Sequence, residues 1–127
     1  MEFREKRLNW LNEQPLETLY LSAMTVAEIR AGVALMPNGK RKKLLSESIE
    51  EKLLPLFAGR VLPFDMSCTR AYAVVLATAK KAGSGIEAAD AVIAATALDG
   101  GFIVATRDKS PFEAAGLKVI NPWNIDK

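Results

Sequence analysis

Short apolar runs alternate with helix-length segments along the 127 residues, and this alternation constrains the fold more than any other feature. Runs typical of buried strands cover residues 19–24, 61–64, 102–105 and 118–120. Helical patterns cover residues 5–14, 25–36, 40–57, 65–81, 84–98 and 110–116. Strands that alternate with helices favour a parallel sheet with helices packed on both faces. We therefore predict an α/β fold, and residues 1–127 have the length of a single domain.

Local signals set the expected boundaries of these elements. Thr25 is the expected N-cap of the helix over 25–36, and a Pro-Asn-Gly turn follows that helix at residues 37–39. The run from Ser84 to Glu87 has the spacing of a capping box, which predicts that the next helix begins there. Pro63 favours an edge position for its strand, because proline cannot donate a hydrogen bond to a neighbouring strand.

The chain contains no histidine, and this absence excludes several kinds of chemistry. Neither a Ser-His-Asp triad nor a Cys-His pair can form without an imidazole. Cys68 is the only cysteine, so it cannot form an internal disulfide or a cysteine-rich zinc site. Walker-type and dinucleotide-binding glycine motifs are also missing. Hydrolysis would therefore rely on carboxylates that hold a hard cation such as Mg²⁺ or Mn²⁺.

Charge and hydropathy give weaker indications of the setting. The net charge of +2 gives little long-range attraction for nucleic acid, so any contact with phosphate would be local. The densest basic run, residues 39–43, could grip an RNA backbone, although short charged runs are commonly solvated helix starts. The N-terminus lacks the apolar core of a signal peptide, the longest apolar run is too short to span a bilayer, and a lone cysteine suits a reducing compartment. We expect a cytoplasmic protein with no membrane partner.

Three acidic residues fall where a parallel sheet would bind a ligand. Glu28 follows the expected strand over 19–24, and Asp108 follows the strand over 102–105. Asp90 lies near the start of the helix that leads into that second strand. Ligands of open parallel sheets bind beyond the carboxyl ends of the strands, and carboxylates from separate segments can converge on one Mg²⁺. We therefore select Glu28, Asp90 and Asp108 as candidate metal-binding and catalytic residues.

Each acid also has a purely structural interpretation. Glu28 stands three residues after Thr25, which is the spacing of a capping box, and Asp108 could be an ordinary turn residue. Asp90 is harder to explain in this way, because its segment over 88–95 is apolar nearly all round and is expected to be buried. A buried carboxylate is costly without a partner or a metal. Three further acids are interpreted as helix-end residues only: Asp65, Glu87 and Asp99.

Five segments resemble, in order, the motifs of PIN-domain toxins of the VapC and FitB type. They are residues 20–32 (YLSAMTVAEIRAG), 61–65 (VLPFD), 89–97 (ADAVIAATA), 104–108 (VATRD) and 121–123 (NPW). Any one of these motifs is weakly specific. Together they extend over nearly the whole chain in the family's order, and that combination is highly specific.

The resemblance implies a fold and an activity that composition alone does not. The fold would be a three-layer PIN-like fold with a parallel sheet flanked by helices. The activity would be a Mg²⁺-dependent endoribonuclease, with Mn²⁺ as an alternative metal, acting as the toxin of a bacterial toxin–antitoxin pair linked to plasmid stability. Glu28, Asp90 and Asp108 would be the site acids, with Asp90 the principal metal ligand. The partners would be a cognate antitoxin that blocks the site, the RNA substrate and a second copy of the chain.

The beginning of the chain departs from the family pattern. The family begins with an apolar strand that ends in Asp-Thr-Asn, whose Asp is a leading metal ligand, and this strand is central to the sheet. The chain joins the pattern in the helix that follows, so the first, central strand is expected to be missing. A truncated product, a misassigned gene start and a natural variant that completes its sheet through a swapped or added strand are three open explanations. We expect unpaired strand edges to promote self-association.

Two other functions compete with an active ribonuclease. A PIN domain with an impaired site could still act as an antitoxin- or RNA-binding module, and metal binding through Asp90 would distinguish the two. A receiver-like phosphoaspartate domain also fits the α/β pattern. It ranks lower because the chain lacks the acidic pair that such a domain needs after an early strand.

Overall fold

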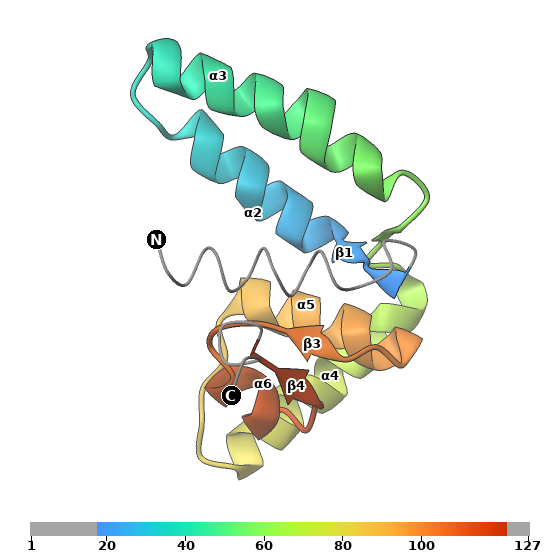
Figure 1. Ribbon diagram of the computed structural model, residues 1–127. Helices are drawn as coiled ribbons and strands as arrows, with labels where there is room; N and C mark the ends of the chain where they lie inside the picture. Colours follow the sequence, from blue (N-terminus) through green and yellow to red (C-terminus); the bar gives the residue numbers. More distant parts are fainter. Residues whose placement is uncertain (1–17, 122–127) are drawn as a thin grey trace. The chain divides into compact units, whose positions relative to one another are not determined.

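The computed structural model describes residues 18–121, which fall into two compact units. The described part of unit 1 comprises residues 64–121, and that of unit 2 comprises residues 18–63. Each unit has its own pair of strands and its own helices (Figure 1). The helix predicted over 5–14 and two residues of the Asn-Pro-Trp motif lie outside the described residues.

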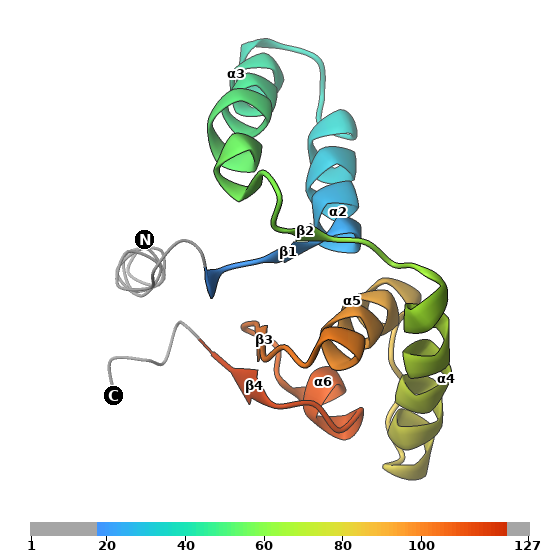
Figure 2. The ribbon, with the colours of Figure 1, turned by 90° about the vertical axis from the view of Figure 1, so that its right-hand side faces the viewer.

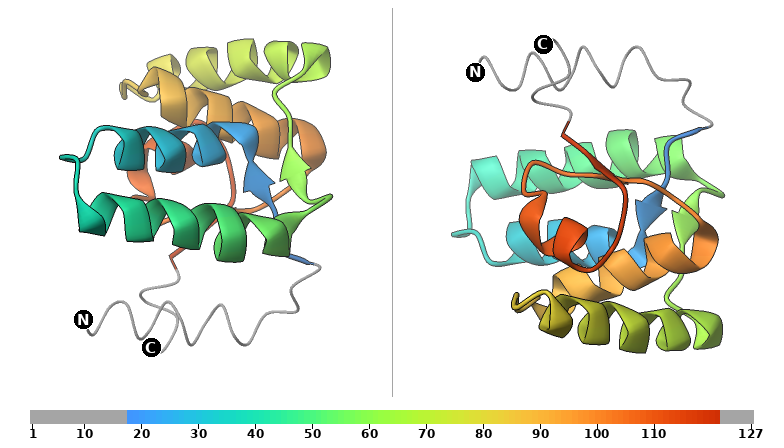
Figure 3. Two further views of the ribbon diagram at one scale, coloured as in Figure 1. Left: turned by 90° about the horizontal axis from the view of Figure 1, so that it is seen from above. Right: turned by 90° about the horizontal axis from the view of Figure 1, so that it is seen from below.

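Unit 2 is a helical hairpin joined to a two-stranded parallel sheet. Its elements are β1 (Leu21–Ser22), α2 (Ala23–Ala34), α3 (Lys40–Ser48), η2 (Ile49–Leu53), η3 (Leu54–Phe57) and β2 (Val61–Leu62). The strands pair with Leu21 opposite Val61, and the hairpin helices α2 and α3 lie side by side (Figure 3). The turn predicted at residues 37–39 connects these helices, as expected from its Pro-Asn-Gly sequence.

Predicted boundaries in unit 2 are wrong at the start of α2 and at the end of α3, among others. The strand ends at Ser22 because the Ser22 side chain caps α2, where its Oγ accepts a hydrogen bond from the Thr25 N–H at 3.0 Å. Thr25 is therefore the third residue of the helix and not its N-cap. The helix predicted over 40–57 is α-helical only to Ser48, and a π-helical turn and a 3₁₀ turn follow. Pro55 lies in that 3₁₀ turn, and its missing N–H cannot continue an α-helical ladder.

Unit 1 packs three helices against a second pair of parallel strands (Figure 2). Its elements are α4 (Met66–Lys81), α5 (Ala88–Gly100), β3 (Val104–Ala105), α6 (Ser110–Ala114) and β4 (Val119–Ile120). In the sheet, Val104 lies opposite Val119. The capping-box prediction for α5 is wrong: the helix begins at Ala88 after Glu87, and no side chain caps it through a hydrogen bond.

The core of unit 1 is built around α5. Ala91, Ala94 and Ala95 are fully buried on this helix, and Val75 of α4 is fully buried opposite them. Small side chains let the two helices approach closely, and the larger Phe112 and Leu117 complete the same core cluster. In unit 2, by contrast, neither α2 nor α3 contains a buried residue.

The parallel direction of the strands confirms the predicted sheet type. Within residues 18–121 the strands form two separate two-stranded sheets, β1–β2 and β3–β4, whereas one continuous sheet was predicted. That residues 1–127 form a single domain stays a prediction. Across the part of the chain that is described, no helix is long and apolar enough to cross a membrane.

Candidate active site

Asp90 lies in the first turn of α5, the helix whose alanines form the core of unit 1. Its side chain is partly buried, and no hydrogen bond or ion pair within residues 18–121 reaches its carboxylate. Burial raises the pKa of Asp90, and the negative charges of Glu87 and Asp108 raise it further. The partial positive charge of a helix N-terminus favours an ionised acid, so burial and neighbouring carboxylates dominate this environment.

Asp108 lies in the turn that follows β3. Its backbone N–H donates to the Thr106 hydroxyl at 3.2 Å, and its own side chain is exposed. The Asn121 side-chain amide donates to the carbonyl of Arg107 at 3.4 Å, which ties the same turn to the end of β4. The charge of Asp108 contributes to the raised pKa of Asp90, and both acids belong to unit 1.

Glu87 is a neighbour that the sequence reasoning missed, because it was interpreted only as a cap. It occupies the N-cap position of α5, yet its carboxylate makes no capping hydrogen bond. Its charge instead acts on Asp90, as the raised pKa of Asp90 indicates. A sequence signal was available: Glu87 and Asp90 are three residues apart, which is a neighbouring distance at a helix start.

Glu28 belongs to unit 2, whereas Asp90 and Asp108 belong to unit 1. Glu28 is exposed in the middle of α2. Its interpretation as a capping-box partner of Thr25 is wrong, because Ser22 is the N-cap and Thr25 occupies the third helical position. The local fold therefore supplies no capping role for Glu28.

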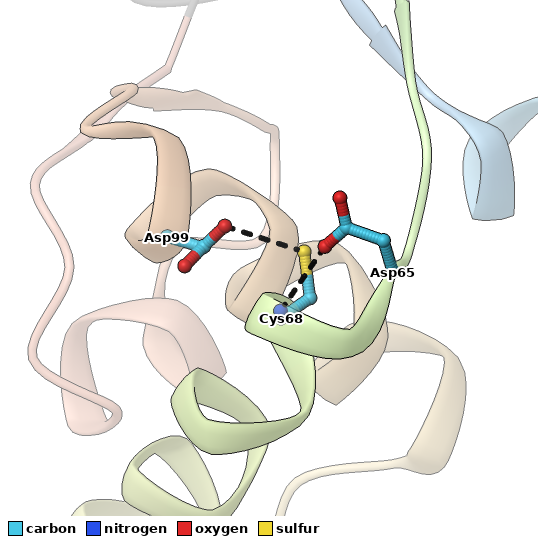
Figure 4. A group of neighbouring side chains, drawn as sticks. All are labelled: Asp65, Cys68 and Asp99. Carbon is cyan, nitrogen blue, oxygen red and sulfur yellow. Dashed lines mark hydrogen bonds between the residues drawn. The ribbon is translucent and has the colours of Figure 1, made fainter.

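A second cluster joins the start of α4 to the end of α5 (Figure 4). One ligand atom each from Asp65, Cys68 and Asp99 lies within 4.8 Å of the others. Asp65 is the N-cap of α4, and its Oδ1 accepts from the Cys68 N–H at 3.3 Å and from the Ser67 hydroxyl at 3.0 Å. Ser67 and the Cys68 thiol also lie 2.7 and 3.7 Å from Asp99 Oδ2.

In the Asp65–Cys68–Asp99 cluster the carboxylate oxygens already accept hydrogen bonds, unlike the carboxylate of Asp90. Hydrogen bonds from Ser67 and then Cys68 lower the pKa of Asp65, while burial raises the pKa of the Cys68 thiol. A protonated thiol is a poor metal ligand, and a cation at the N-terminus of α4 would oppose the helix dipole. The Asp65–Cys68–Asp99 cluster therefore fits a helix-capping network, even though its atoms are near enough to hold a cation.

Asp90 and Asp108 offer the ligand type that a hard divalent cation prefers, whereas the described residues whose ligand atoms gather within 4.8 Å are Asp65, Cys68 and Asp99. Oxygen ligands suit such an ion, and neither carboxylate is neutralised by a basic side chain within residues 18–121. Glu87 adds a third negative charge beside them. Mutual repulsion of this kind is relieved when a cation binds, whereas a purely structural network would pair each carboxylate with a donor.

The fold is that of a PIN domain, and the PIN-domain family model matches residues 2–117. The chain belongs to the PIN-domain family. It is 65% identical over 116 residues to the plasmid stability protein StbB of Pseudomonas syringae pv. tomato, with 91% of this chain and 84% of that protein covered. It is 58% identical over 116 residues to the VapC ribonuclease Y4jK of Sinorhizobium fredii, with coverages of 91% and 83%.

Similarity to the toxin FitB of Neisseria gonorrhoeae extends to the structure. The two sequences are 52% identical over 120 residues, which cover 94% of this chain and 86% of FitB. The crystal structure of FitAcB from the same organism matches with a TM-score of 0.90 over 94% of this chain and 86% of that one. The structure of FitAB bound to the IR36 DNA fragment gives the same TM-score, with coverages of 94% and 84%. The predicted α/β fold and the resemblance to VapC- and FitB-type toxins are confirmed.

Proposed function

We propose that the chain is a divalent-metal-dependent endoribonuclease that acts as the toxin of a toxin–antitoxin pair. The observation that carries the proposal is the position of Asp90, a partly buried acid in the first turn of α5 whose pKa is raised by burial and then by the charges of Glu87 and Asp108. The name of a relative at 58% identity, VapC ribonuclease, supports the reaction class. Mg²⁺ is the proposed metal and Mn²⁺ the alternative, because both prefer oxygen ligands.

Asp90 and Asp108 would hold the metal, with Asp90 as the principal ligand, and Glu28 is the third proposed site acid. A bound Mg²⁺ lowers the pKa of a coordinated water and neutralises charge that develops on the scissile phosphate. The chain's own contribution is positional: α5 fixes Asp90 against a packed core, and the turn after β3 fixes Asp108. Glu87 increases the negative potential that attracts the cation.

We further propose a cognate antitoxin as the protein partner and RNA as the substrate. The relatives named toxin FitB and plasmid stability protein StbB support this setting. A homodimer or a strand-swapped oligomer is the proposed assembly. Each sheet has two strands within residues 18–121, and an unpaired strand edge invites pairing, which supports this assembly.

The test is cleavage of a labelled single-stranded RNA by the purified chain with Mg²⁺, with Mn²⁺ and with a chelator. Asp90→Asn should lower metal-dependent cleavage by at least about 100-fold, because even residues that only support metal ligands cost 10–100-fold when changed. Asp99→Asn is the matched control, since Asp99 is an acid near the other end of the same helix. Activity that survives Asp90→Asn but not Asp99→Asn would assign the metal to the Asp65–Cys68–Asp99 cluster. A folded chain that binds RNA without cutting it would be a binding module.

A further inference from the structure

The first turn of α3 carries four consecutive basic residues, 40–43, at the tip of the hairpin with α2 (Figures 1 and 3). This turn contains no acidic residue, and its N-cap, Gly39, has no side chain to accept a hydrogen bond. A helix N-terminus carries partial positive charge, so cations there destabilise the helix. The basic turn therefore breaks a local rule of helix stability, and such exceptions concentrate at functional sites.

Helix α4 follows the same rule that α3 breaks. Its N-cap is an acid, Asp65, and its last turn carries Lys80 and Lys81. Both placements complement the helix dipole. The lysines of α4 thus have a structural explanation, whereas helix electrostatics opposes the basic residues of α3.

One of the four basic residues has a structural role. The Lys42 ammonium donates to the Ala34 carbonyl at 3.0 Å and to Asn38 Oδ1 at 3.2 Å, which ties the start of α3 to the end of α2. The other three, Lys40, Arg41 and Lys43, are exposed, and neither ion pair within residues 18–121 includes them. A hollow of about 650 Å³ opens between the two helices, and its charged lining residues include Lys42 and Lys43 as well as Glu47 and Glu50.

We propose that Lys40, Arg41 and Lys43 contact the phosphate backbone of RNA. The proposal rests on the proposed function in one respect, that RNA is the substrate. Lysine and arginine supply most protein contacts to phosphate, and a bound polyanion would neutralise the charges that the dipole of α3 disfavours. The tip lies roughly 10 Å from Glu28 along α2, at 1.5 Å per residue. An RNA strand that is bound at the tip is therefore within reach of Glu28, a proposed site acid in the same unit.

The experiment measures RNA binding in chelator, so that cleavage plays no part. Fluorescence anisotropy of a labelled single-stranded RNA is followed between about 50 and 200 mM salt for the wild type and for a variant with Lys40, Arg41 and Lys43 changed to Gln. The matched control changes Lys80, Lys81 and Lys118 to Gln, which removes the same charge from exposed positions in unit 1. A third variant, Lys40→Arg with Lys43→Arg, keeps the charge at the tip.

The tip variant should bind RNA with a log–log salt slope flatter by about two, because each phosphate contact to a single strand contributes about 0.7. Its Tm should equal or exceed that of the wild type, and the control and the arginine variant should keep the wild-type slope. An unchanged slope in the tip variant, equal losses in the tip and control variants, or a lower Tm in the tip variant would each overturn the proposal. Loss of binding to poly-L-glutamate with an unchanged RNA slope would assign the tip to an acidic protein and also overturn it. None of these results depends on cleavage, which the Asp90→Asn comparison tests separately.

Discussion

Helices α5 and α2 each carry a predicted site acid, but they hold it in different ways. In α5, five residues are buried, and Asp90 is fixed at the edge of a packed core. In α2 no residue is buried, and Glu28 projects from an exposed hairpin. A ligand on a packed element keeps its geometry, and precise geometry is what metal binding requires. We therefore expect Asp90 to be the stronger metal ligand and Glu28 to have a supporting role.

The largest expected effect separates the two acids in cleavage assays. Asp90→Asn should remove at least about 100-fold of the metal-dependent activity, and Glu28→Gln should remove about 10-fold, within the range for supporting residues. Both substitutions preserve shape and remove one charge, so initial rates at saturating Mg²⁺ can be compared directly. An equal or larger loss from Glu28→Gln would mean that the exposed helix supplies the stronger ligand.

The next effect concerns the packing that distinguishes the helices. Ala94 is fully buried on α5, so Ala94→Leu should destabilise the protein by about 1–3 kcal/mol through overpacking. Ala31 is exposed on α2, and Ala31→Leu should change the free energy of unfolding by less than about 0.5 kcal/mol. Urea denaturation followed by circular dichroism measures both. Similar losses from the two variants would show that α2 is packed as tightly as α5.

The same contrast explains which parts of the site the sequence could predict. Asp90 was recognisable because an acid in an apolar segment must lie against a core, and the structure places it there. Glu87 was missed because a cap position and a site neighbour look identical when only the spacing is known. The start of α2 was misplaced because Ser22 and Thr25 are both good caps, and only the hydrogen bond between them decides the choice. The division into two sheets depends on pairing between distant segments, which local patterns do not encode.

A smaller effect is the pH dependence of stability that Asp90 introduces. Its pKa is raised in the folded chain, so the folded state binds the proton more tightly than the unfolded state. The stability that this proton contributes is fully present below the unfolded pKa of about 3.9 and is lost as the pH rises through the folded pKa. In chelator, Asp90→Asn should therefore have a higher Tm than the wild type at neutral pH, and the difference should shrink in acid.

Added Mg²⁺ provides the check on this interpretation of Asp90. A cation that binds the folded state raises the Tm by mass action, so the wild type should gain stability and Asp90→Asn should not. Thermal melts with and without Mg²⁺, at neutral and acidic pH, measure this. A wild type that is more stable than Asp90→Asn in chelator would mean that Asp90 has a favourable partner in the fold and is not held in a repulsive environment.

The smallest expected effect tests whether α2 is as loosely held as its exposure indicates. Arg30 donates to both carboxylate oxygens of Glu50, at 2.9 and 2.8 Å, and so joins α2 to η2. The hydrogen bond from Arg30 lowers the pKa of Glu50, so the stability from this pair is present at neutral pH and is lost as the pH falls through the folded pKa. Both side chains are exposed, so Arg30→Ala should lower the Tm only slightly, and high salt should remove the difference. A large, salt-insensitive decrease would mean that one ion pair holds the hairpin rigid, and Glu28 would then be as firmly placed as Asp90.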